Sequence, residues 1–160
     1  MIDYFQHLEH ARRFIQTAEH LLTETFPLVR DPRMLLSVLQ NVYGSYKSMM
    51  LFYLNRDLEQ GKIPPFDQDP ENMIRLFKAR NERRYSINPD YVKNLEEIYA
   101  ILKEHRKSPM EFSRHEMLVI SDESYNMKTV TTQRLRDYIN KAKTFIVESS
   151  PARVEHGRIS

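Results

Sequence analysis

The sequence predicts an all-α protein, an antiparallel helical bundle of about five helices with a small β-hairpin before the last helix. Apolar residues recur at intervals of three and four along most of the chain, as they do on one buried face of a helix. Glycine is scarce, at 3 of 160 residues, so few tight turns are available. With 41% hydrophobic residues, the chain is long enough to bury a core as a single domain.

Two long helices are expected first. One runs from about Tyr4 to Thr25, and Phe26-Pro27 should end it. Asp31 and Pro32 suit the start of the next helix, because Asp caps free N–H groups and proline needs no N–H in the first turn. That helix should end before Gly61, a plausible C-cap. A short turn between two long helices predicts antiparallel packing.

One face of the second helix is made of small residues that would let another helix approach closely. It comprises Asn41, Gly44, Ser45 and Ser48. The partner is either a helix of the same chain or a second copy in a dimer, and both readings stay open.

The next elements are bounded by proline. Residues 62–69 predict a linker. Asp69-Pro70 should begin a third helix that runs to about Arg84. Asn88-Pro89 should begin a fourth that stops before Ser108-Pro109.

The pattern then changes from helix to strand and back. Met117 to Ser121 and Met127 to Val130 are β-prone runs, which predict the hairpin. Thr131 should cap the last helix. We therefore expect one domain over residues 1–148 and a disordered tail over residues 149–160.

Composition favours a cytoplasmic protein without a membrane span. The chain has no cysteine, no run of roughly 18 apolar residues, and no basic and apolar leader at its start. A net charge of +2 is too mild to indicate nucleic-acid binding by itself.

Metal and cofactor sites are not expected. The sequence has no Gly-rich phosphate loop, no G-x-S-x-G elbow and no H-E-x-x-H motif. His10 and His20 on the first helix are about 15 Å apart along the axis, too far to share an ion.

The most basic stretch lies at the end of the third predicted helix. Its cations are Arg75, Lys78, Arg80, Arg83 and Arg84. Arginine suits phosphate because its planar fork donates two hydrogen bonds, and the ring of Tyr85 could stack on a base. The pattern indicates either a phosphate-binding surface or a solvated helix face.

A string within this stretch, Arg80-Asn81-Glu82-Arg83-Arg84-Tyr85, differs at one position from the ribonuclease signature R-N-x-x-x-H. Together with the helix of Tyr91 to Leu102, the segment Leu76 to Tyr85 resembles HEPN domains, and the layout of residues 1–107 is similar to theirs. HEPN domains are all-helical bundles of toxin–antitoxin, defence and RNA-processing proteins. The resemblance implies a homodimer that brings two motifs together.

Carried over by residue, the resemblance gives Arg80 the place of the motif arginine and Asn81 that of its polar neighbour. Tyr85 stands where the family has histidine. Imidazole titrates near neutrality, whereas a phenol has a pKa of about 10 and is a poor base. The resemblance thus implies a catalytically degenerate homodimer that binds RNA or a nucleotide. The binding residues would be Lys78, Arg80, Asn81, Arg83, Arg84 and Tyr85.

Two alternatives remain. The first is an active, metal-independent endoribonuclease in which Arg80 stabilises charge and Tyr85 assists. Its imidazole could instead come from His105 or His115, in a polar connection over residues 103–116 that should be a loop. The second is a helical module that binds a protein partner and no nucleic acid, with the small-residue face and the hairpin as its working surfaces.

Overall fold

Helices account for most of the chain, as predicted. The computed structural model describes residues 3–107, 111–113, 117–121 and 127–150. The helical elements are α1 (Tyr4–His20), the π turn η1 (Leu21–Thr25), α2 (Phe26–Val29), α3 (Arg33–Glu59), α4 (Pro70–Leu76), the π turn η2 (Phe77–Asn81), α5 (Glu82–Arg84), α6 (Pro89–Lys107) and α7 (Thr132–Ser149). The strands are β1 (Glu111–Ser113), β2 (Met117–Ser121) and β3 (Met127–Thr131). The all-α bundle and its hairpin are confirmed.

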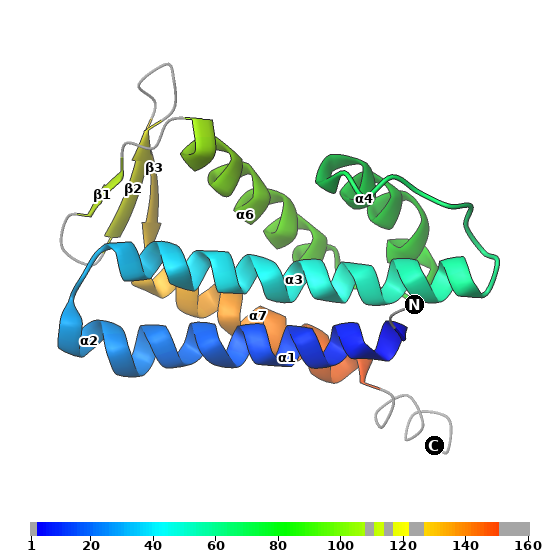
Figure 1. Cartoon of the computed structure of the whole chain (residues 1–160), viewed down its shortest axis with the longest axis horizontal. Coiled ribbons are helices and arrows are strands. Elements are labelled where there is room, and N and C mark those ends of the chain that lie inside the picture. The colour runs from blue at the N-terminus through cyan, green and yellow to red at the C-terminus, as the bar shows by residue number, and fades with distance from the viewer. Residues whose placement is uncertain (1–2, 108–110, 114–116, 122–126, 151–160) are drawn as a thin grey trace.

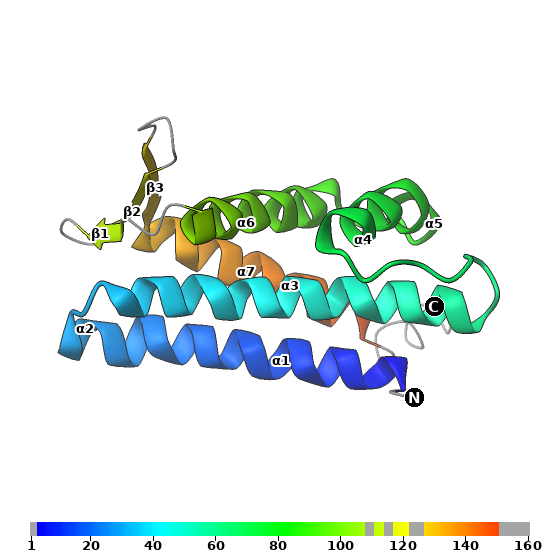
Figure 2. The same ribbon diagram turned by 45° about the horizontal axis from the view of Figure 1, so that its top comes forward.

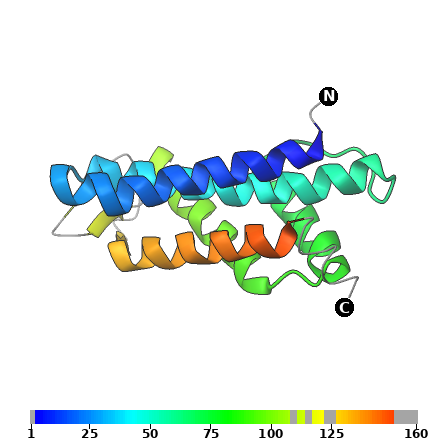
Figure 3. The same ribbon diagram turned by 90° about the horizontal axis from the view of Figure 1, so that it is seen from below.

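Helix α3 is the central element. It lies antiparallel to α1, and α7 runs alongside both (Figures 1 and 3). Helices α4 and α6 cover the side of α3 that faces away from α1 (Figure 2). The sheet closes one end of the bundle (Figure 1), and α5 lies near the C-terminal end of α3 at the other end (Figure 2).

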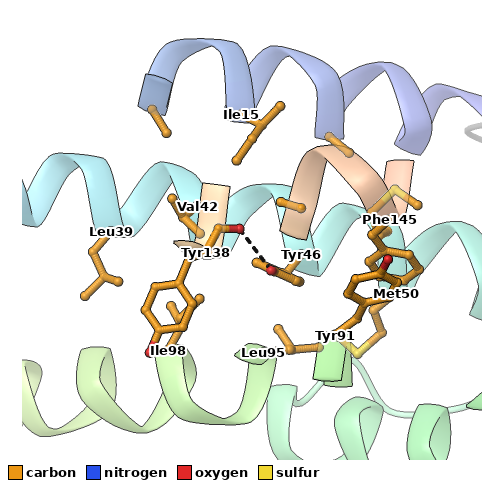
Figure 4. Packing of buried hydrophobic residues seen from close by; sticks show 14 of the residues in the cluster. Ile15, Leu39, Val42, Tyr46, Met50, Tyr91, Leu95, Ile98, Tyr138 and Phe145 are labelled. Atoms are coloured by element: carbon orange, nitrogen blue, oxygen red, sulfur yellow. Dashed lines mark hydrogen bonds between the residues drawn. The ribbon is translucent and has the colours of Figure 1, made fainter. Parts of the chain in front are cut away.

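Aromatic side chains join α3, α6 and α7 in the core (Figure 4). Tyr46 of α3 is buried, and its hydroxyl donates to the backbone oxygen of Tyr138 at 3.0 Å. The same hydroxyl accepts from the amide of Asn94 at 3.2 Å. The ring of Phe145 stacks on that of Tyr91, with centroids 4.5 Å apart. The hydroxyl of Tyr46 therefore has both a donor and an acceptor partner, as a buried polar group requires.

The prediction that the first helix ends at Phe26-Pro27 is wrong. The helical path continues through η1 and α2 to Val29, and Arg30 then turns the chain with a φ of 52°. The N–H of Phe26 bonds to the carbonyl of Leu21, five residues back. Proline lacks an N–H, and the wider turn before it lets the helix pass without that donor.

The four later helix starts are confirmed by their caps. In each, a side-chain oxygen accepts a hydrogen bond from a backbone N–H two or three residues further on, which satisfies a donor that the first turn leaves free. The pairs, acceptor first, are Asp31 and Arg33 (3.0 Å), Asp69 and Asn72 (3.1 Å), Asn88 and Asp90 (3.0 Å), and Thr131 and Arg134 (3.0 Å).

Helix α3 ends at Glu59, before Gly61 as predicted. Gly61 has a φ of +70°, which favours glycine. The N–H of Lys62 bonds to the carbonyl of Asp57 at 2.8 Å, and that of Gly61 to the carbonyl of Leu58 at 3.1 Å. This is a Schellman motif, and it satisfies two carbonyls at the helix end.

The small-residue face of α3 packs against α1 of the same chain. A Cβ on Gly44 would lie 2.7 Å from the ring of Phe14, so glycine admits this ring. The hydroxyl of Ser45 donates to the backbone oxygen of Ala11 at 3.0 Å. The face is therefore used within the chain at these two positions.

The sheet has one strand more than the predicted hairpin. Strands β2 and β3 pair antiparallel, and β1 pairs with the other edge of β2, with Phe112 opposite Val119. The fourth helix stops at Lys107, before Ser108 as predicted, and the polar connection that follows contains strand β1 at Glu111–Ser113 rather than loop throughout. A two-stranded hairpin is marginal alone, and a third strand adds pairing.

The last helix extends one residue into the predicted tail. Ser149 ends α7, is buried, and its hydroxyl lies 2.5 Å from that of Tyr53. The predicted tail over residues 151–160 lies outside the described residues. No helix in the described part of the chain is long and apolar enough to cross a membrane.

We expect Gly61→Ala to lower the free energy of unfolding by about 1 kcal/mol, because a side chain disfavours the left-handed conformation of this residue. Urea denaturation measures the change. Gln60→Ala is the matched control, since Gln60 precedes it with a φ of −84° and should change little. Equal stabilities of the two variants would contradict the expectation.

Candidate functional site

The segment that carries the arginine string departs from regular α-helix on both sides of the short helix α5. It contains the π turn η2, and Ser86, which follows Tyr85, has a φ of 52°. The N–H of Ile87 returns to the carbonyl of Glu82 at 3.0 Å and closes the segment. Single π turns inside helices are frequent at functional sites, and a left-handed residue other than glycine is held at a cost.

A buried carboxylate of α3 holds this segment. Asp57 is fully buried, and its Oδ2 accepts from the amide of Asn81 at 2.7 Å and from the guanidinium of Arg84 at 2.5 Å. Its Oδ1 accepts from the hydroxyl of Tyr85. A buried charge needs partners, and here Arg84 supplies the opposite charge while Asn81 and Tyr85 add hydrogen bonds.

Asn81 is the buried residue of the arginine string, and it donates a hydrogen bond to Asp57. Its side chain is fully buried, so its part is to hold Asp57 rather than to contact a ligand. Its Oδ1 has no hydrogen-bond partner within the described part of the chain. A buried acceptor left in this way is rare and costly.

The cations of this segment, from Lys78 to Arg84, differ in their exposure and in their ion-pair partners. Arg80 and Arg83 are exposed and form no ion pair with any described residue. Arg84 keeps about a third of its side chain exposed (32%) beside Asp57. Lys78 is exposed and pairs with Glu96 of α6 at 3.3 Å. Two arginines therefore remain available to an anionic partner.

Tyr85 is a hydrogen-bond donor in this arrangement. Burial raises the pKa of its phenol above the usual value of 10, and its hydrogen bond to the carboxylate of Asp57 raises it further. The phenol is thus protonated at neutral pH, and its proton is directed at Asp57. Tyr85 does not have the properties of a general base.

Three aromatic rings, one of them that of Tyr85, contact the guanidinium of Arg56. Its guanidinium carbon lies 4.3 Å from the ring centroid of Tyr85, 5.0 Å from that of Phe52 and 5.2 Å from that of Tyr53. It forms no ion pair with a described residue. Cation–π contacts thus hold this guanidinium in place.

A pocket of about 340 Å³ opens beside Arg56 and Tyr85. It is lined by Tyr53, Arg56, Gln60, Lys62, Tyr85, Glu148 and Ser149. Arg56 and Lys62 bring two positive charges. Glu148 brings one negative charge, and the C-terminal ends of α3 and α7 each add roughly half a negative charge. The pocket is therefore close to neutral, unlike the exposed arginines nearby.

His105 does not complete the string. Lys103 pairs with Glu71, as Lys78 does with Glu96, so α4 and η2 run antiparallel to α6. His105 lies beyond Lys103, more than two helical turns along α6 from the level of Arg80. His115 lies outside the described residues. Among the described residues, no group of three or more His, Asp or Glu side chains could hold a metal ion.

Comparison with protein-family models, with curated proteins and with solved structures finds no match of any of these kinds.

Sequence reasoning missed Asp57, which holds the segment, and the residues that line the pocket beside Tyr85, Arg56 and Glu148 among them. A signal for Asp57 was present, because it follows Tyr53 by four residues and so continues the apolar stripe of α3. An acidic residue on a buried stripe indicates a partner elsewhere in the fold. Glu148 had no such signal, since it is exposed on α7.

We expect Asp57→Ala to lower the free energy of unfolding by about 3 kcal/mol, since it leaves Arg84, Asn81 and Tyr85 without their shared acceptor. Urea denaturation measures the loss. Glu59→Ala, an exposed change on the same helix, is the control and should alter stability by less than about 0.5 kcal/mol. A comparable small effect of both changes would show that the carboxylate does not hold the segment.

Stability should also fall in alkaline solution. Burial raises the pKa of Tyr46, Tyr53, Tyr85 and Tyr138 in the folded chain. Unfolded tyrosines release their protons near pH 10, so the stabilisation is present below that pH and is lost as the pH rises above it. Urea denaturation at about pH 8 and about pH 10.5 tests this, and equal free energies of unfolding would contradict it.

Proposed function

We propose that the chain binds single-stranded RNA or a nucleotide and is a HEPN-like protein without efficient cleavage. The observation that carries the proposal is the exposure of Arg80 and Arg83, without acidic partners among the described residues, on a segment anchored to Asp57. A guanidinium fork donates two hydrogen bonds to phosphate and stays charged. The anchoring fixes the backbone that carries these arginines, which lowers the cost of ordering this segment when a ligand binds.

The state of Tyr85 favours binding over cleavage. RNA hydrolysis through the ribose 2′-hydroxyl needs a group that takes up a proton near neutral pH. The raised pKa of Tyr85 and its hydrogen bond to Asp57 oppose that role. The protein would therefore hold RNA in a defence, toxin–antitoxin or RNA-processing setting in the cytoplasm, as the resemblance implies.

A homodimer belongs to the same proposal. In the resembling family two copies of the motif face each other, which would double the number of arginines along one RNA strand. Because Gly44 and Ser45 already contact α1, a second copy would use another surface. The end of the bundle that carries η2 and α5 is the surface that would bring two Arg80 side chains together.

We expect the double variant Arg80→Glu, Arg83→Glu to weaken RNA binding, as measured by fluorescence anisotropy with a labelled single strand. Wild-type binding should weaken with salt, because phosphate contacts release counterions. If both arginines contact phosphate, the double variant should lower the salt slope by about two units.

The matched control is Arg136→Glu together with Arg12→Glu. Both are outside η2 and α5, and the pair makes the same change in net charge. Incubation of the same strand tests for cleavage, and cleavage that Arg80→Ala abolishes would identify a ribonuclease instead. If the wild-type chain does not bind RNA at low salt, the proposal is refuted, and the alternative that remains is a helical module that binds a protein partner.

A further inference from the structure

We propose that the pocket beside Tyr85 takes one unstacked guanine base of a bound RNA strand. This inference rests on the proposed function, and it names the base that the same site selects. The pocket is formed at the ends of α3 and α7 and beside α5. Proteins that recognise single-stranded RNA stack its splayed bases on aromatic rings or guanidinium planes and read their edges with hydrogen bonds.

The charge distribution separates a place for phosphate from a place for a base. Arg80 and Arg83 are exposed cations outside the pocket, where a backbone phosphate can keep most of its hydration. The pocket itself is nearly neutral, because Glu148 and two helix C-termini offset Arg56 and Lys62. A phosphate would gain little there, whereas a nucleobase carries no net charge.

The guanidinium of Arg56 provides a surface on which a base can stack. Rings of Phe52, Tyr53 and Tyr85 surround it at 4.3 to 5.2 Å, so its position is set before a ligand arrives. Its remaining exposed surface lines the pocket. A planar, weakly hydrated guanidinium stacks well on an aromatic face.

Glu148 supplies the preference for guanine. The hydroxyl of Tyr91 donates to its Oε2 at 3.0 Å, which orients the carboxylate at the pocket wall. A carboxylate accepts hydrogen bonds only, and guanine offers two adjacent donors, N1–H and the N2 amino group, to both of its oxygens. Adenine and cytosine place a ring acceptor beside their amino group, and uracil has a single N–H between two carbonyls. Each of these would set a lone pair against the carboxylate.

The test compares labelled uridine hexamers that differ at one central position. Fluorescence anisotropy at low salt measures the affinity for the hexamer with guanine, with adenine, with cytosine and with uracil there. We expect the wild-type chain to bind the guanine hexamer about tenfold more tightly than the others. Glu148→Gln should remove that preference while the hexamers still bind, since the amide still accepts from Tyr91 but presents its own donors to the base.

Glu24→Gln is the matched control. Glu24 is exposed on η1, away from the lining of the pocket, and the change removes the same charge. This variant should keep the guanine preference, and thermal unfolding checks that both variants fold. Equal wild-type affinities for the four hexamers, or a preference that survives in Glu148→Gln, would overturn the guanine pocket while RNA binding stands. Absence of binding to every hexamer would refute the proposed function itself.

Discussion

The carboxylate of Asp57 is the constraint on which the arrangement of the site depends. It is fully buried at the end of α3, and three side chains from residues 81–85 converge on its two oxygens. A charge in this position would be costly without them, so the helix and the segment hold each other in place. Because Tyr85 is fixed in this way, its ring is also fixed as one support for Arg56 and as one wall of the pocket.

Much of the fold follows from short-range rules that the sequence displays openly. Asp69, Asn88 and Thr131 precede helices because their side chains satisfy free N–H groups, and Gly61 ends one because of its backbone freedom. The wrong predictions concern features that depend on long-range contacts or on unusual backbone geometry. The π turn before Pro27 lets the helix continue past a residue that has no N–H. No local sequence pattern predicts such a turn. Strand β1 has three residues, too few for a periodic signal, and depends on β2 for its pairing.

The site was predictable in part, for a related reason. The basic string is contiguous in sequence, so its composition alone identified it. Its environment comes from the distant ends of α3 and α7, and only the folded chain places Arg56 and Glu148 beside Tyr85. The sequence could not show that Asp57 pairs with Arg84 and not with Arg80. Which of the cations form ion pairs depends on tertiary contacts.

The π turn η2 gives this segment a tolerance to chain length that a regular helix lacks. It contains one residue more than an α-helical turn would need, and the helical path continues into α5 beyond it. Deleting one residue within Phe77–Asn81 would therefore restore regular α-helix and leave the rotation of α5 unchanged, so that Arg84 and Tyr85 would still face Asp57. The same deletion in a regular helix such as α6 would rotate everything after it by about 100° about the axis.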